Sequence, residues 1–421
     1  ENISLVKGND AAMYGSLGAN GVILINTEKA TDLETKVEFH TVEGAGWMNK
    51  RIPMMDAIGF KNYIGDIGET ATSDLESLVS KFPFLKDDPD YHYNYVYDNN
   101  TKWQDEIYTP AIISENILKV KGGDAIANYA LSVGYFYNRG VVENTKLSKY
   151  FTRLNANMKI TPKLKMFASV GFTYSDNKLM EQGMAYSTNP LLTALYKSPL
   201  FDVYEKDQYG NQLGRFSKIE YGENNPVADA IGISNPVAIV NDLEATSSAY
   251  DVLVNAGLNY QMNSKIAFNA LVGVYYNYNR ENIFIPGKTS QAIDGIAKNT
   301  VRSGVAEGYN LYFNANGTYS DLFHEVHGLD VTLGYQLITT NREYDYGTGI
   351  NTSSDFYKTL GSATGMYGKN FDGYIDVYNW MNIYAKAAYN FKKQLFLSAG
   401  GTADAASSTG TNSNLFVFLP S

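Results

Sequence analysis

Apolar and polar residues alternate with a period of two along much of the chain. Between positions 309 and 319, one set holds Tyr309, Leu311, Phe313, Ala315, Gly317 and Tyr319, and the other holds Asn310, Tyr312, Asn314, Asn316 and Thr318. Because successive side chains of a β-strand point to opposite faces, this pattern predicts a strand with one apolar and one polar face. The same alternation recurs in 154–160, 252–260, 329–337 and 383–391.

The pattern predicts about eleven strands in all. Their approximate spans are 36–46, 113–121, 127–138, 149–160, 164–177, 250–261, 265–280, 307–320, 328–344, 377–391 and 394–404. Several are about ten residues long or longer, which is the length of a tilted strand that crosses a membrane.

The connections between these strands alternate in length. Short turns are expected at 122–125, 161–163, 262–264, 321–327 and 392–393, and long connections at 47–112, 178–249, 281–306 and 345–376, with a shorter one at 139–148. Bacterial outer-membrane barrels have short periplasmic turns and longer outer loops. The sequence therefore predicts an all-β fold, a transmembrane antiparallel β-barrel. A soluble β-sandwich or propeller with one buried face is the alternative, since its strands alternate too.

Tyrosines stand where the two membrane interfaces of such a barrel would lie. Tyr260, Tyr319 and Tyr389 occupy the apolar face beside short turns. Tyr174 and Tyr276 occupy the same face toward the long connections. Amphipathic rings gather at the level of the lipid headgroups, so this placement favours the membrane barrel.

The amino-acid composition argues against several classes of function. The formal net charge is −10 and no long Lys/Arg cluster occurs, which argues against a nucleic-acid partner. The chain has no Cys and 4 His, so a thiolate or transition-metal centre is not expected, and His324 and His327 lack the spacing of a zinc motif. The acidic group Asp87, Asp88 and Asp90 is interpreted as a solvated loop. We find no catalytic, cofactor or metal site and expect no enzyme.

One aromatic-rich stretch is the candidate contact region. Tyr91, Tyr93, Tyr95 and Tyr97, with Trp103, lie in the first long connection. Aromatic faces stack on sugar rings and pack on peptides, so these side chains are candidate contacts to a ligand or to a lid protein. Packing inside the loop is the other interpretation, and the pattern favours it.

Residues 2–27, NISLVKGNDAAMYGSLGANGVILINT, resemble the end of the plug domain in SusC/RagA-type TonB-dependent transporters. The resemblance rests on the Tyr14–Gly15 pair and on the run Gly18–Ile23. Glycine-rich residues 15–21 are expected to form a tight turn that feeds a strand at Val22–Asn26. Further similarity lies in Trp103–Tyr108, Gly122–Gly123, Gly140–Val141, Ser198–Pro199 and Phe418–Ser421. Asn9–Asp10 and the stretch 401–408, which lacks the usual Arg, depart from the family pattern.

The resemblance implies a domain division and an incomplete barrel. Residues 1–30 would be the C-terminal end of the plug domain, and residues 31–421 the N-terminal half of the barrel. Barrels of such transporters have about 22 strands. Since an open sheet edge is unsatisfied in lipid, we expect further strands to close the barrel and further plug residues before Glu1.

The resemblance also implies a function. It is import of glycans or peptides across the bacterial outer membrane, with a SusD-like surface lipoprotein as lid. The TonB–ExbB–ExbD machinery would supply energy, and outer-membrane lipid would surround the apolar face. A dimer or larger envelope complex is compatible with it. The alternative is a SusC-like barrel that serves as a structural scaffold subunit of a larger outer-membrane complex. A passive porin or adhesive barrel is less favoured, because an open pore needs no plug.

Overall fold

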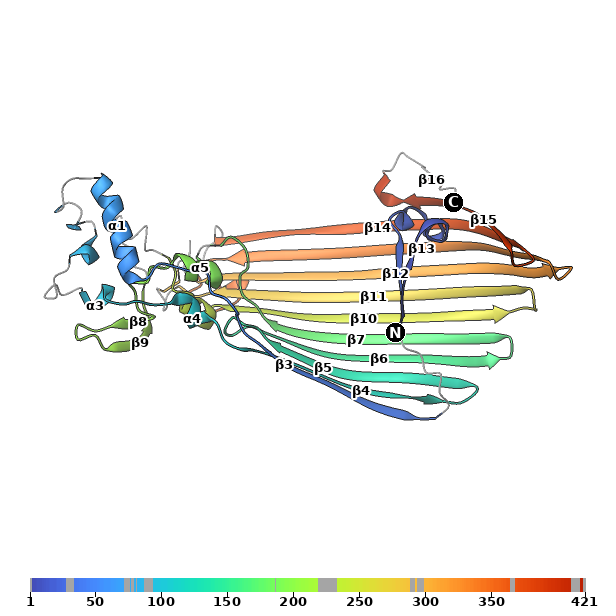
Figure 1. Cartoon of the computed structure of the whole chain (residues 1–421), viewed down its shortest axis with the longest axis horizontal. Helices are drawn as coiled ribbons and strands as arrows, with labels where there is room; N and C mark the ends of the chain where they lie inside the picture. The colour runs from blue at the N-terminus through green and yellow to red at the C-terminus, as the bar shows by residue number, and fades with distance from the viewer. Residues whose placement is uncertain are drawn as a thin grey trace.

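One large antiparallel sheet dominates the computed structural model (Figure 1). The structure describes residues 2–27, 34–71, 76, 79–80, 82–86, 94–185, 187–218, 233–287, 292–293, 299–363, 368–409 and 417–418. The strands of the sheet are β3 (Lys36–Gly46), β4 (Ala111–Gly123), β5 (Ala127–Arg139), β6 (Lys146–Thr161), β7 (Leu164–Lys178), β10 (Glu244–Gln261), β11 (Ile266–Ile285), β12 (Thr300–Phe323), β13 (His327–Gly349), β14 (Lys369–Phe391), β15 (Leu395–Ala406) and β16 (Val417–Phe418). They pair in this order, so the sheet is an up-and-down meander.

The eleven predicted strands are confirmed as β3–β7 and β10–β15. The observed strands are longer, chiefly toward the long connections: β12 has 24 residues and β14 has 23. The alternation of apolar and polar residues ends there, but backbone pairing does not require an apolar face. Glu343 and Tyr344, for example, still pair with Ile375 and Tyr374 of β14. Each predicted strand therefore ended where its apolar face ended, although the observed strand continues.

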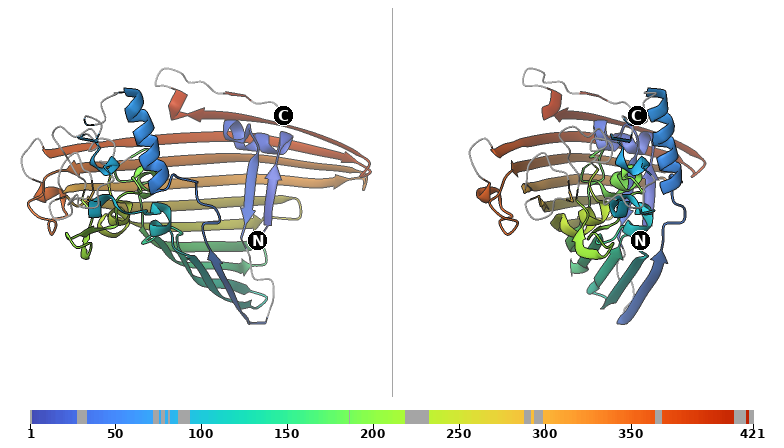
Figure 2. Two further views of the ribbon diagram at one scale, coloured as in Figure 1. Left: turned by 60° about the vertical axis from the view of Figure 1, so that its left-hand side comes forward. Right: turned by 90° about the vertical axis from the view of Figure 1, so that its left-hand side faces the viewer.

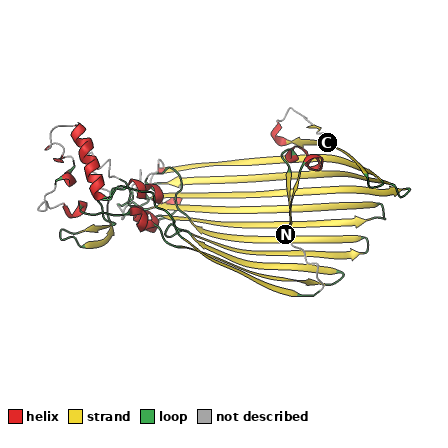
Figure 3. Ribbon diagram, in the orientation of Figure 1, coloured by secondary structure: helices red, strands yellow, loops and turns green. Residues whose placement is uncertain are grey.

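The two ends of the sheet differ as the connection lengths predicted. Short turns lie at one end, and helices and irregular segments gather at the other (Figure 3). Lys392 and Lys393 have φ of 51° and 56°, and His324 and Glu325 have φ of 50° and 62°. Positive φ at two consecutive residues, with a hydrogen bond from Val326 N to the Phe323 carbonyl and from Gln394 N to the Phe391 carbonyl, gives a tight turn whose twist suits a hairpin. The His324–His327 stretch is thus a tight turn.

The two faces of the sheet differ in chemistry. One face carries large exposed apolar side chains: Leu258, Phe268 and Leu333 are 44%, 48% and 61% exposed. Polar side chains on the other face bond across strands, as where Asn269 Nδ2 donates to Asn316 Oδ1 at 2.9 Å. An apolar outer face and a polar inner face are the pattern of a membrane barrel, so we assign the apolar face to lipid.

A row of tyrosine rings crosses the apolar face near the long connections. Tyr135, Tyr150, Tyr174, Tyr250 and Tyr278 follow one another on β5, β6, β7, β10 and β11, with ring centroids 4.8, 6.3, 4.9 and 6.3 Å apart. The row contains the predicted Tyr174. Such a belt places the outer headgroup level at these residues.

The first residues form a separate hairpin on the concave side of the sheet (Figure 2). Strand β1 (Asn2–Val6) pairs with β2 (Val22–Asn26), and the 3₁₀ segment η1 (Gly8–Gly18) connects them. Gly21, with φ of 93°, allows the tight turn into β2 that the sequence predicted. The predicted domain boundary at residue 30 lies outside the described residues, so that division stays a prediction.

The helices lie in the long connections. They are α1 (Ala57–Ala71), α3 (Asn94–Tyr97), α4 (Trp103–Ile107), α5 (Pro190–Tyr196) and α7 (Pro236–Asp242), with 3₁₀ turns η2 (Pro83–Leu85), η3 (Leu360–Ser362) and η5 (Ser407–Thr409). Asn189 and Asn235 start α5 and α7 by accepting from backbone N–H groups, and a proline follows each. Across the described residues, no helix has the length and apolar character to cross a membrane.

The assignment of faces predicts opposite effects at two neighbouring residues of β13. Leu333→Lys puts a charge in lipid and should lower the free energy of unfolding by about 2 kcal/mol or more. Thr332→Lys faces the polar interior and should change it little. Urea unfolding of the complete protein in bilayers would measure both, and equal losses would contradict the assignment.

Candidate functional site

The long connections share an apolar core at one end of the sheet. Segments that are far apart in the sequence contribute its buried side chains. These are Phe84, Tyr97, Trp103, Ile107, Val142, Ala194, Leu200, Phe201, Val203, Val237 and Val240. We call this set the loop core. The long connections, which we call the loop assembly, therefore pack around an apolar core that is separate from the sheet.

Hydrogen bonds tie the first long connection to the second. Trp103 Nε1 donates to the carbonyl of Ser198 at 2.9 Å, and the side-chain amide of Asn99 donates to the carbonyl of Leu200 at 2.9 Å. The backbone N–H of Thr101 donates to Pro199 at 2.9 Å. Helix α4 and the end of α5 are therefore held side by side.

A pocket of about 610 Å³ opens where α1, α4 and α5 meet. Its walls are residues 51–56, Phe60, Tyr63, 100–105 and 194–199. Met54, Met55, Tyr63 and Tyr196 are about half exposed there. At one side Arg51 Nε donates to Asp105 Oδ1 at 2.9 Å, and the Arg51 guanidinium lies 4.7 Å from the centroid of the Tyr108 ring. This pocket, which we call the loop pocket, combines an apolar floor with polar groups at its rim and has the size of ligand sites.

The predicted contact residues have different positions. Tyr97 and Trp103 are buried in the loop core, so packing accounts for both, although Trp103 also borders the loop pocket. Tyr95 is half-buried and lines a second pocket of about 270 Å³. Tyr91 and Tyr93 lie outside the described residues. A ligand or lid contact at these positions stays a prediction.

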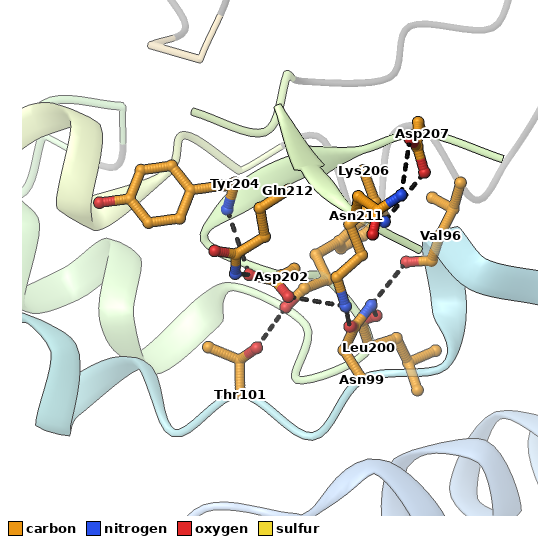
Figure 4. Close-up of polar contacts among 11 residues, drawn as sticks. Val96, Asn99, Thr101, Leu200, Asp202, Tyr204, Lys206, Asp207, Asn211 and Gln212 are labelled. Carbon is orange, nitrogen blue, oxygen red and sulfur yellow. Dashed lines mark hydrogen bonds and ion pairs between the residues drawn. The ribbon is translucent and has the colours of Figure 1, made fainter. Parts of the chain in front are cut away.

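The second pocket is built around a small hairpin, β8 (Tyr204–Lys206) with β9 (Gln212–Phe216). Figure 4 shows its polar contacts. Lys206 Nζ lies 2.7 Å from Asp202 Oδ2 and also bonds to the Asn99 side chain. At the tip, Asp207 accepts from the backbone of Tyr209 and Asn211, both at 2.9 Å. Five charged side chains line this pocket, and they pair with one another: Lys206 with Asp202, and both Arg215 and Lys218 with Glu205.

Residues 51–56 and α1, which line the loop pocket, were not predicted from the sequence. This part of the first long connection has no period of two, so it predicts a loop. A signal was present, however: Phe60, Ile64 and Ile67 stand at helical spacing. Phe60 and Ile64 pack against the loop core as this spacing indicates.

Acidic side chains cluster beside α4. Burial raises the pKa of the Glu106 carboxyl, and the neighbouring carboxylates of Asp105 and Asp202 raise it further. Among the described residues, no group of three or more His, Cys, Asp or Glu is placed to hold a metal ion.

Known proteins that are similar to this chain in sequence are TonB-dependent receptors. No protein-family model matches the chain. The TonB-dependent receptor P3 of Formosa agariphila is 24% identical over 427 residues, which cover 97% of this chain and 37% of the receptor. The TonB-dependent receptor SusC of Bacteroides thetaiotaomicron is 23% identical over 276 residues, covering 62% of this chain and 24% of SusC. The chain thus spans well under half the length of these relatives.

Solved structures agree on the fold. The RagAB peptide importer in its open-open state superposes with a TM-score of 0.80 at 17% identity. The superposition covers 99% of this chain and 47% of the importer chain.

The buried Trp103 should hold the loop assembly together. Trp103→Ala should lower the stability of that assembly by about 3–5 kcal/mol, because it removes a large buried ring. Trp103→Phe keeps most of the packing, loses one hydrogen bond, and should cost about 1 kcal/mol. Hydrogen exchange in 94–107 and 190–200 would measure both, with β10–β13 as internal reference. Equal effects of the two variants would contradict this role.

Glu106 should make the loop assembly sensitive to pH. Above the ordinary carboxyl pKa of 4.5 and up to the raised value, the folded loop keeps a proton that the unfolded loop releases. Stability should therefore fall as the pH rises through this window, and Glu106→Gln should abolish that fall. Proteolysis of the loops across pH tests this, with the exposed Glu143→Gln as control. An unchanged pH profile in Glu106→Gln would refute it.

Proposed function

We propose that this chain is part of a SusC/RagA-type TonB-dependent transporter of the outer membrane and that the complete protein is an active importer. Its cargo would be a glycan or a peptide. A SusD-like surface lipoprotein would act as lid, and TonB–ExbB–ExbD would supply the energy.

The observation that carries the proposal is the position of the β1–β2 hairpin. It lies on the polar, concave side of the sheet and crosses several strands (Figure 1). The Asn155 side chain donates to Thr27 Oγ1 at 3.3 Å next to β2, and the Asn382 amide on β14 donates to the carbonyl of Met13 at 2.9 Å. A segment seated across the interior obstructs it. Passage of a large solute then requires work to open a path, which distinguishes an importer from a passive porin.

The loop pocket supplies a place of capture on the outer side. Its half-exposed methionines and aromatic rings give apolar contact, and the polar rim around Arg51 and Asp105 gives hydrogen-bonding groups. Such a surface fits a peptide backbone with apolar side chains, and its aromatic rings equally suit the faces of sugars. The similarity in fold to the RagAB peptide importer supports a peptide as cargo. The similarity to SusC keeps a glycan as the other candidate cargo.

Co-purification distinguishes the importer from the scaffold. The complete complex would be isolated from native membranes in mild detergent, and each chain identified by mass spectrometry. The importer predicts one SusD-like lipoprotein in matching amount with little else. A stable set of several unrelated envelope proteins would favour the scaffold and overturn import.

The loop pocket predicts a specific loss of uptake. Met54→Asp combined with Met55→Asp places charge on the apolar floor and should lower cargo affinity about tenfold, the loss expected when roughly 1.4 kcal/mol of contact is removed. Phe356→Asp is the control, because Phe356 is 91% exposed on another connection. Cells that carry either variant would be compared for uptake at limiting cargo. Equal uptake in both would remove the pocket from the pathway.

A further inference from the structure

The inner wall at β14 and β15 holds a group of almost fully buried polar side chains. Trp380, Asn382, Thr402 and Asp404 are 2%, 0%, 2% and 4% exposed. They stand on the polar face, where η1 of the hairpin contacts both strands. The hairpin is therefore docked on this part of the wall.

Asp404 is the one charged member of the group. Its Oδ2 accepts from the backbone N–H of Ser16 at 3.0 Å, from the Ser16 hydroxyl, and from Trp380 Nε1 at 3.0 Å. Among the described residues, nothing donates to Oδ1. Two of the three donors to this carboxylate thus come from the hairpin. A buried charge that loses its donors is unfavourable, so carboxylate and hairpin stabilise each other's position.

The backbone at Gly15 fits this carboxylate closely. Its φ is 59°, and a Cβ there would lie 3.0 Å from the Trp380 ring and 3.1 Å from Asp404 Cγ. Two residues earlier, the carbonyl of Met13 accepts from the Asn382 side chain at 2.9 Å. Asn382 is itself held, because its Oδ1 accepts from the Thr402 hydroxyl. Residues 13–16 therefore meet a prearranged set of wall groups.

We propose that Asp404 is a positioning residue that fixes the hairpin to β14–β15, and that residues 13–16 stay on this wall while cargo passes. The second half of the proposal rests on the proposed import function. The hairpin is tied at Asp404 and, near its other end, at Asn155. Opening then takes place elsewhere in the plug or in the loops, and β14–β15 form the stationary side of the path.

Hydrogen exchange of the complete protein tests the positioning role. Asp404→Ala removes the acceptor, and exchange in residues 13–16 should become about tenfold faster or more, as expected for loss of hydrogen bonds to a charged group. Asp404→Asn keeps the size, loses the charge, and should give an intermediate rate; it also serves if the alanine variant folds poorly. Asp330→Asn, an exposed carboxylate on β13, is the matched control and should leave this exchange unchanged. Wild-type exchange rates in both Asp404 variants would overturn the role.

A buried reporter tests whether residues 13–16 stay in place. The chain has no cysteine. Thr402→Cys would place a thiol on the wall beneath the hairpin, with Asp330→Cys as the exposed control, and the complete protein without either substitution would give the background labelling. In energised cells supplied with cargo, the thiol at position 402 should stay unreactive toward a thiol reagent, and adding Asp404→Ala should make it reactive. Labelling at position 402 that rises with energy and cargo, with Asp404 intact, would overturn the stationary wall.

The two tests fail separately. Absence of cargo uptake in the wild type would remove the proposed function and the stationary wall that rests on it. The exchange result concerns only the docking of the hairpin at Asp404 and holds in either case.

Discussion

Backbone hydrogen bonding in a medium without water is the constraint on which the rest of this structure depends. A strand in lipid must give every N–H and C=O a partner on a neighbouring strand. From β4 to β13 each strand is paired on both sides along most of its length, and the register runs without a break through β10–β14. Pairing on both sides frees the side chains to differ by face, apolar toward lipid and polar toward the interior. The described sheet has two edges, at β3 and β16, where this constraint remains to be met.

The polar inner face in turn makes it possible to seat a plug. An apolar wall could bind a hairpin only through buried apolar surface, which does not select a position. Side-chain amides and a carboxylate instead form hydrogen bonds with particular backbone groups. Asn382 and Asp404 do this at β14 and β15. The loop assembly meets a different requirement, since it lies beyond the membrane and has its own apolar core around Trp103 and Leu200. One chain thus combines three kinds of stabilisation: paired backbone in the wall, polar docking inside it, and a conventional core above it.

The wall could be predicted from the sequence because its signal is local. A strand such as 309–319 shows its two faces in eleven consecutive residues, and the length of each connection shows at which end it lies. The ends of the strands were harder to predict, because backbone pairing continues near Glu343 where the apolar face has already ended. The loop pocket and the Asp404 contact could not be predicted, because they join residues that are far apart in the chain. Ser16 and Asp404 are separated by 388 positions. The aromatic stretch was recognised, but composition could not tell that Trp103 is buried.

The most direct measurement of the central claim, that a plug docked on the inner wall through this hairpin closes a pore, is conductance. The complete purified protein would be inserted into planar bilayers, alone and with the whole plug up to residue 26 removed. The account predicts no steady current through the intact protein and a stable, large conductance through the shortened one. A steady open current through the intact protein, unchanged by the deletion, would contradict it.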